Sequence, residues 1–366
     1  MDLLLQCRQN NWRKVAFIGM AKHAGKTTAL NGFLHQLRDA EESVGLLSVG
    51  VDGERLDAIL GVPKPRVFVD YGTYVVSAER ALLDSEAFFE WISELPISSP
   101  LGPVMVARVT TPGTVVLAGI RQRAHVQMAV DALTHLGCRY VLVDGAFDRV
   151  AAATPTLVDA AVLAVGAVVG SAAKEVAEHA QPVIERFALP ETHSAWKDTF
   201  LEARQTRQAA LAVHQEDEPP HHLDVLYVPA HAVMFDVTRQ MGWSDDVAAV
   251  YIPGAVTDGT VDSLVRHPRE LEIVADHPAQ VLISGSAHRR LMRHGHRLSV
   301  WDRLPLAAIA VNPHHIAGLD LPAEELLSAV AEVAGDVPVY DAMQVPETCN
   351  VREETLPYGA VEGGES

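Results

Sequence analysis

Along the first half of the chain, short runs of apolar residues alternate with longer stretches in which apolar residues recur every three or four positions. The short runs predict buried strands, and the longer stretches predict amphipathic helices. The predicted strands span 14–19, 44–50, 140–145 and 160–166, and the predicted helices span about 26–40 and 124–136. Strand, helix and strand in this order predict an α/β fold with a mostly parallel sheet covered by helices.

Two further stretches have the pattern of β-hairpins. Residues 66–76, RVFVDYGTYVV, and residues 103–119, PVMVARVTTPGTVVLAG, each place apolar residues on both sides of a glycine-containing turn signal. Because such turns join antiparallel strands, each stretch predicts one hairpin.

The pattern breaks at 214–222, HQEDEPPHH, where acids and paired prolines predict a linker. Beyond the linker, apolar runs separated by helix-length stretches resume at 223–230, 248–255, 279–287, 306–313 and 337–342. We therefore expect two domains, 1–215 and a second α/β unit at 222–366. The pattern leaves open whether the later strands extend the first sheet or build their own.

The composition is that of a globular protein, with 48% hydrophobic and 21% charged residues in 366. The formal charge of −18 argues against a protein that binds nucleic acid through its phosphate backbone, because such binding needs a basic face. A small anionic ligand needs only a local ring of donors and is compatible with this charge.

Cysteine usage and hydropathy bear on the compartment. Cys7, Cys138 and Cys349 are far apart, match no metal spacing and indicate reduced thiols. The first residues show no secretory signal, and the longest apolar run, residues 160–170, is about half a membrane span. We expect a cytoplasmic protein that does not cross a membrane.

The stretch IGMAKHAGKTTALNGF, residues 18–33, carries the strongest chemical signal. It follows a predicted strand, opens a predicted helix and almost fits the phosphate-binding loop G-x-x-x-x-G-K-[ST], with Gly19 one place early. Helix-start N–H groups attract phosphate, and Gly25 permits close approach of the backbone. Lys26 would reach the β- and γ-phosphates, and the Thr27 hydroxyl would coordinate Mg²⁺.

Other residues of this loop are candidate nucleotide contacts. They are Lys22, His23, Ala24 and Thr28, of which Thr28 would reach an α-phosphate oxygen. Lys22 is either a second phosphate-contacting lysine or a solvated loop lysine, and His23 could donate a hydrogen bond to phosphate.

A phosphate-binding loop needs an acid at the end of a neighbouring strand. The stretch YVLVDGAFDR supplies Asp144, which would hold Mg²⁺ directly or through water, with Asp148 as a weaker candidate. Asp144 would otherwise cap a strand-to-helix turn. After the second strand, Asp52 is placed to orient the attacking group or the metal, unless this segment is a solvated loop.

Two observations bear on which nucleotide base the protein binds: one residue that is present and one motif that is absent. The chain has no N-K-x-D tetrapeptide of the guanine-specific proteins. Asn312, at the end of a late apolar run, could pair with the adenine edge or could form an Asn-Pro turn. We expect ATP, with GTP less favoured.

The early glycine has a parallel in known families. Loops of the form G-T-x-x-x-x-G-K-T occur in dethiobiotin synthetases and cobyrinic acid diamide synthases, so this loop resembles that branch of P-loop NTPases, which also contains MinD and ParA. Together, GMAKHAGKTTALN, SVGVDGERLDAILGVPKPRV, DGAFDR and IPGAVTDGTVDSLV resemble the small P-loop subunit of the reactivase found with bacterial lysine 5,6-aminomutase. The sequence departs from that family at Met20 and His23, where Thr and Asn are common.

The resemblance implies an accessory ATPase that acts as a nucleotide-driven switch in lysine degradation. Such a subunit would work with a partner ATPase to expel damaged cobalamin from a cobalamin-dependent aminomutase. Two alternatives stay open: an ATP-dependent ligase that activates a small carboxylic acid, and a module that binds nucleotide without turnover.

A basic run, HRRLMRHGHR at 288–297, is unusual in so acidic a chain. It is interpreted first as a solvated helix face and second as a docking surface for an acidic partner or substrate. A zinc site is the least favoured interpretation.

Overall fold

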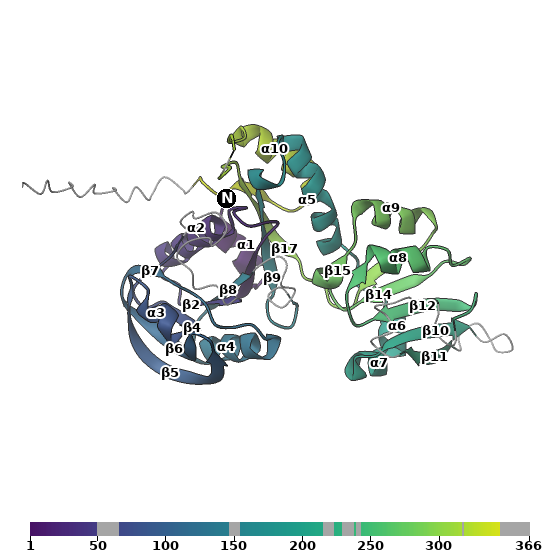
Figure 1. Ribbon diagram of the computed structural model, residues 1–366, viewed down its shortest axis with the longest axis horizontal. Coiled ribbons are helices and arrows are strands. Elements are labelled where there is room, and N and C mark those ends of the chain that lie inside the picture. The colour runs from purple at the N-terminus through teal and green to yellow at the C-terminus, as the bar shows by residue number, and fades with distance from the viewer. Residues whose placement is uncertain are drawn as a thin grey trace, which may run out of the picture.

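The computed structural model describes residues 1–49, 66–145, 154–214, 223–228, 238, 243–316 and 318–344. These residues form two lobes, each built around its own β-sheet (Figure 1). The protein is an α/β protein whose larger sheet is mostly parallel.

The larger sheet has nine strands in the order β18-β17-β9-β1-β8-β2-β4-β6-β5. All neighbours from β18 to β4 are parallel, and β4, β6 and β5 pair antiparallel. In chain order, the strands are β1 (Lys14–Gly19), β2 (Val44–Val49), β4 (Tyr74–Ala78), β5 (Phe88–Ser99), β6 (Gly102–Thr111), β8 (Tyr140–Gly145), β9 (Ala160–Gly166), β17 (Leu306–Asn312) and β18 (Val339–Asp341).

Helices cover both faces of this sheet because its central strands are apolar on both sides. In β1, Ala16 and Ile18 face one core while Val15 and Phe17 face the other. The helices of the first core are α4 (Arg123–His135), α5 (Ala173–Phe187) and α10 (Ala323–Ala334), and those of the second include α1 (Leu3–Gln9) and α2 (Lys26–Asp39). This three-layer arrangement confirms the predicted α/β class.

Neither predicted hairpin forms. Strand β3 (Val67–Val69) pairs with β7 (Gly113–Val115), while β4, the other half of the first predicted hairpin, pairs with β2 and β6. The hairpin of this region joins β5 to β6, with helix α3 (Glu79–Leu83) before β5. Strand β5 was not predicted because most of its residues are exposed and lack a clear alternation.

The smaller sheet has the order β11-β10-β12-β14-β16. Its strands are β10 (Ala209–His214), β11 (Leu223–Val228), β12 (Val247–Ile252), β14 (Glu272–Ala275) and β16 (Arg297–Val300), of which the last three are parallel. Helices α8 (Asp258–Leu264) and α9 (Gly285–Arg293) contribute to the core on one face. Phe200, between α6 (Ser194–Thr199) and α7 (Leu201–Thr206), packs on the other. Strands β13 (Val256–Thr257) and β15 (Val281–Leu282) form a separate small ladder.

The sheets divide the chain differently from the predicted boundary near residue 215. Strand β10, before that boundary, belongs to the smaller sheet, and β17 and β18 return to the larger one. The segments that link the lobes lie side by side, since Thr192 N–H donates to Val300 O at 2.8 Å and Val300 N–H donates to Pro190 O at 3.0 Å. The smaller lobe is therefore an insertion between α5 and β17.

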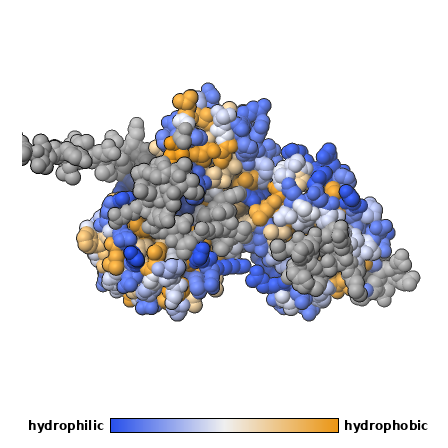
Figure 2. Space-filling model, viewed as in Figure 1, coloured by the Kyte–Doolittle hydropathy of each residue, from blue (hydrophilic) through white to orange (hydrophobic). Residues whose placement is uncertain are grey.

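The two lobes differ in the surface that they present. Figure 2 shows hydrophobic residues on the first lobe near β7 and near α10, whereas the visible face of the second lobe is mostly hydrophilic. Within the described part of the chain, no helix has the length and apolarity needed to cross a membrane.

Candidate functional site

The predicted phosphate loop connects β1 to α2 at the carboxyl edge of the larger sheet. Strand β1 ends at Gly19 and α2 begins at Lys26. Gly25 is the N-cap of α2 with φ +94°, a left-handed conformation that favours glycine, and no side chain caps this helix. The helix therefore starts with backbone donors that its own side chains do not satisfy.

Lys26 and Asp144 lie in direct contact. Lys26 Nζ is 2.6 Å from Asp144 Oδ1, and both side chains are largely shielded from solvent. In the parallel pairing, Asp144 at the end of β8 stands beside Phe17 of β1 and Ser48 of β2. The Ser48 hydroxyl donates to Asp144 Oδ2 at 3.3 Å. The structure thus brings together two residues that the sequence places 118 positions apart.

The pairing of Asp144 leaves one of its oxygens short of partners. Oδ1 is buried and makes no hydrogen bond with the described residues, so its only described partner is the Lys26 ammonium. Carboxylate and hydroxyl oxygens suit Mg²⁺, which keeps several waters and takes few protein ligands. The Asp144 carboxylate and the hydroxyl of Thr27, half-buried in the first turn of α2, are oxygens of this kind.

The other predicted loop residues occupy distinct environments. Ala24 is buried, Lys22 is exposed, and Thr28 is half-buried in the first turn of α2. His23 has φ +62°, unusual for a residue other than glycine. The first loop residue, Met20, donates its N–H to Ala164 O of β9 at 3.0 Å, which continues the pairing of β1 with β9.

Asn312, the predicted base contact, lies directly against the loop. It is buried at the end of β17, and its Nδ2 donates to His23 O at 3.4 Å. Its Oδ1 accepts the His314 N–H at 3.2 Å. The amide of Asn312 is thus engaged with backbone groups on both sides.

Two residues of this site were absent from the sequence interpretation. Ser48 is the penultimate residue of β2, and Gly166 is the last residue of β9, where a Cβ atom would lie 2.6 Å from Ala24 Cα. The ends of neighbouring parallel strands meet at one edge, so Ser48 was identifiable in principle as a neighbour of Asp144. The contact between Gly166 and Ala24 has no local sequence signal.

Some predicted residues lie outside the described residues. These include the catalytic and metal candidate Asp52 and the weaker candidate Asp148. Among the described residues, no three His, Cys, Asp or Glu side chains gather as a metal-binding group.

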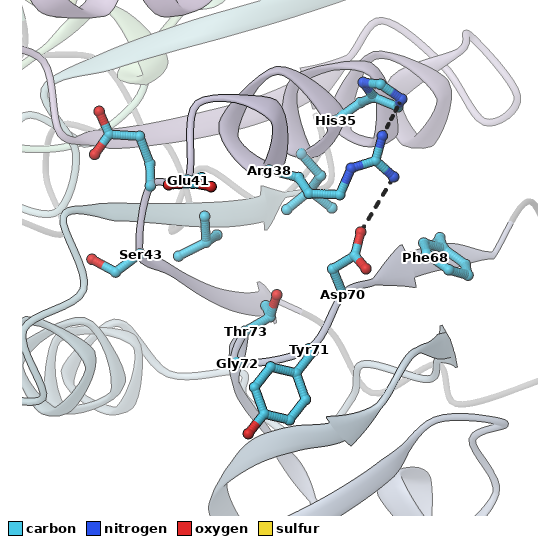
Figure 3. A pocket seen from close by; sticks show the side chains of 12 residues that line it. His35, Arg38, Glu41, Ser43, Phe68, Asp70, Tyr71, Gly72 and Thr73 are labelled. Carbon is cyan, nitrogen blue, oxygen red and sulfur yellow. Dashed lines mark hydrogen bonds and ion pairs between the residues drawn. The ribbon is translucent and has the colours of Figure 1, made fainter. Parts of the chain in front are cut away.

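A pocket of about 390 Å³ lies at the opposite end of α2 from the phosphate loop. Arg38 reaches from α2 to Asp70, with Nη1 3.3 Å from Oδ2, and its Nη2 lies 2.5 Å from His35 Nε2 (Figure 3). Thr73 and Ser43 line the same pocket at the amino ends of β4 and β2. No residue of this pocket was predicted as a functional residue from the sequence.

The carboxyl edge of the smaller sheet carries a second group of polar residues. Tyr251 of β12 donates its hydroxyl to Asp276 Oδ1 at 2.5 Å, and Arg204 Nε is 3.6 Å from the same oxygen. Arg204 also forms an ion pair with Asp302, and its Cζ is 4.7 Å from the centre of the Trp301 ring. Burial raises the pKa of Asp276 and the pKa of Tyr251.

The basic run predicted at 288–297 forms most of α9 and the start of β16. Two of its arginines are paired with acids: Arg290 with Asp262 and Arg297 with Glu270. Arg289 and Arg293 are exposed, and no acid within the described ranges pairs with either. A mostly solvated helix face accounts for this arrangement.

Comparisons with family models, with curated proteins and with solved structures find no match to this chain.

Proposed function

We propose that this protein is a P-loop ATPase that binds ATP and Mg²⁺ and works as a nucleotide-driven switch. The observation that carries the proposal is the contact between Lys26 and Asp144 beside an uncapped helix start. A lysine from the loop and an acid from the next strand over are the groups that such enzymes use on the phosphates and the metal.

In this proposal, the residues of the candidate site have specific roles. The backbone N–H groups at Gly25 and in the first turn of α2 bind phosphate oxygens. Lys26 exchanges its ion pair with Asp144 for the β- and γ-phosphates, which frees the Asp144 carboxylate. Thr27 and Asp144 would hold Mg²⁺, which supplies charge neutralisation on the transferred phosphoryl group. Ser48, through its bond to Asp144 Oδ2, fixes the orientation of this carboxylate.

The same exchange gives a physical basis for a switch. In the structure, Lys26 of α2 and Asp144 of β8 neutralise each other. In this proposal Lys26 would turn to the triphosphate and Asp144 to Mg²⁺, so the carboxyl ends of β8 and of its neighbour β2 would have a second arrangement with different partners. The resemblance to the reactivase subunit extends the proposal to two protein partners. They are a partner ATPase and a cobalamin-dependent aminomutase, which would respond to this switch.

The experiment is an ATPase assay of the purified chain with and without Mg²⁺. We expect slow, magnesium-dependent release of phosphate that Lys26→Ala abolishes. Lys174→Ala, a change of the same type at an exposed lysine of α5, serves as the matched control and retains the rate.

The assay also separates the alternatives. ADP formation that depends on an added small carboxylic acid would favour a ligase, and tight ATP binding without turnover would favour a nonhydrolysing module. Either result would contradict the proposed ATPase.

A further inference from the structure

The phosphate loop is supported from the sheet by two strands that are distant in sequence. Strand β9 contacts the loop twice, through Ala164 O to Met20 N–H at 3.0 Å and through the close approach of Gly166 to Ala24. Strand β17 contacts it through Asn312. Gly166 and Asn312 are direct neighbours in the pairing of β9 with β17, so the two contacts form one continuous surface.

At Gly166 the fit is too close for a side chain. A Cβ atom there would lie 2.6 Å from Ala24 Cα and 3.0 Å from Ala24 C and O, and all three are backbone atoms. Backbone cannot rotate aside as a flexible side chain does, so any larger residue would displace the loop. Glycine at this position lets the buried Ala24 segment rest directly on the end of β9.

At Asn312 the fit is reciprocal. A Cβ atom on Gly25 would lie 2.5 Å from Asn312 Cβ, so the N-cap of α2 packs against the asparagine side chain. The Asn312 amide donates to His23 O at 3.4 Å and is itself oriented by the His314 N–H at 3.2 Å. His23 has the left-handed backbone that turns the loop toward the helix, so Asn312 holds the carbonyl of the residue where the loop turns.

We infer that Gly166 and Asn312 form a seat that positions the phosphate loop, and that Asn312 supports phosphate binding rather than reading the base. This inference rests on the proposed nucleotide site. A loop held in its binding conformation spends less free energy on ordering when the phosphates bind. The seat should therefore set the affinity for any triphosphate by the same factor, whether or not a base is attached.

Inorganic tripolyphosphate, which has no base, provides the test. Its binding and that of ATP are measured by calorimetry in Mg²⁺ for the wild-type chain, Asn312→Ala and Gly166→Ala. We expect each variant to bind both ligands on the order of tenfold more weakly, with the ratio of the two affinities unchanged. Asn312→Ala keeps the Cβ that contacts Gly25 and removes only the amide, so it provides a milder variant should Gly166→Ala fold poorly.

Gly113→Ala is the matched control for a general loss of stability. A Cβ atom at Gly113 would lie 2.7 Å from Ala87 N, a backbone clash of similar severity in β7, and Gly113 pairs with β3. We expect it to lower the melting temperature without changing either affinity.

Three results would overturn the inference. Loss of ATP affinity alone in Asn312→Ala would show that Asn312 reads the base. Unchanged affinities in both variants would show that the seat has no role. A wild-type chain that binds neither ligand would contradict the proposed function itself, and this inference with it.

Discussion

The carboxyl edges of the parallel strands in the two sheets are built in opposite ways. At the larger sheet, small loop residues leave the start of α2 without a side-chain cap, and Asp144 Oδ1 has only Lys26 as a described partner. At the smaller sheet, Tyr251, Asp276 and Arg204 satisfy one another. Aromatic rings fill the space around them, with Phe200 5.9 Å and Trp301 5.8 Å from the Tyr251 ring.

The two edges differ in how completely their polar groups are paired, and this difference distinguishes a binding site from a structural contact. Polar groups that await a ligand keep donors and acceptors incompletely paired, whereas a polar network that holds a fold together is closed. Trp301 and Asp302 belong to the segment that leads from β16 back to β17. The second edge therefore anchors the connection between the lobes, and incomplete pairing at the first is consistent with the phosphate site that we propose there.

Lys26→Ala should have the largest effect. Among the residues that the structure describes, this ammonium is the one side-chain cation in contact with Asp144, and its loss would remove the proposed charge-assisted contacts to the phosphates. We expect affinity for Mg·ATP to fall by roughly a hundredfold or more, at about 1.4 kcal/mol for each factor of ten. A fluorescent ATP analogue in equilibrium titration measures this effect, and unchanged affinity would place the nucleotide elsewhere.

Arg204→Ala should have the opposite effect. It should lower the stability of the protein and leave its affinity for ATP unchanged. Asp276 and Asp302 both lose their cation, and Trp301 loses the guanidinium above its ring. We expect the free energy of unfolding of this lobe to fall by about 2 kcal/mol, less than for a fully buried pair because Arg204 and both carboxylates are partly exposed. Urea unfolding followed by tryptophan fluorescence gives the value. A loss of ATP affinity without a loss of stability would show that the second edge is a ligand site.

Acidic pH should lower the stability of the second lobe because His277 is buried there. Burial, with the charges of Arg123 and Arg204, lowers the pKa of His277 from 6.5 to about 4. Below pH 6.5 the unfolded chain binds a proton that the folded chain does not, so this contribution to stability is lost as pH falls toward 4. Between pH 7 and pH 5 we expect a loss of about 2 kcal/mol. His277→Gln should remove this slope, and an equal slope in wild type and variant would refute its assignment to His277.

Gly32→Ala should have the smallest effect and the opposite sign. Gly32 lies inside α2, and a Cβ atom there would meet nothing within 4 Å. Alanine at such a helix position is expected to raise stability by roughly 0.5–1 kcal/mol. Thermal unfolding measures this gain, while ATP affinity should stay constant because the proposed phosphate site involves only the first turn of α2.

The sequence predicted the features that depend on local pattern. The apolar runs that became β1, β2, β8 and β9 are buried on both faces, so continuous hydrophobicity marks them. The positions of Gly25 and Lys26 at the start of α2 followed from the same reasoning, since a loop of small residues after a strand leads into a helix.

Features that depend on pairing between distant segments were not predictable in this way. Nothing in the run at 306–312 indicates that β17 pairs with β9 rather than with the smaller sheet. Strands β14 and β16 have four residues each, too few for a clear pattern. The seat at Gly166 and Asn312 likewise arises only when β9 and β17 are adjacent.

Calorimetric titration of the wild-type chain with ATP, in the presence and absence of Mg²⁺, tests the central claim most directly. The proposed site predicts saturable binding of one ATP per chain that strengthens when Mg²⁺ is added. Titration that shows no saturable binding at millimolar ATP, with or without the metal, would contradict it.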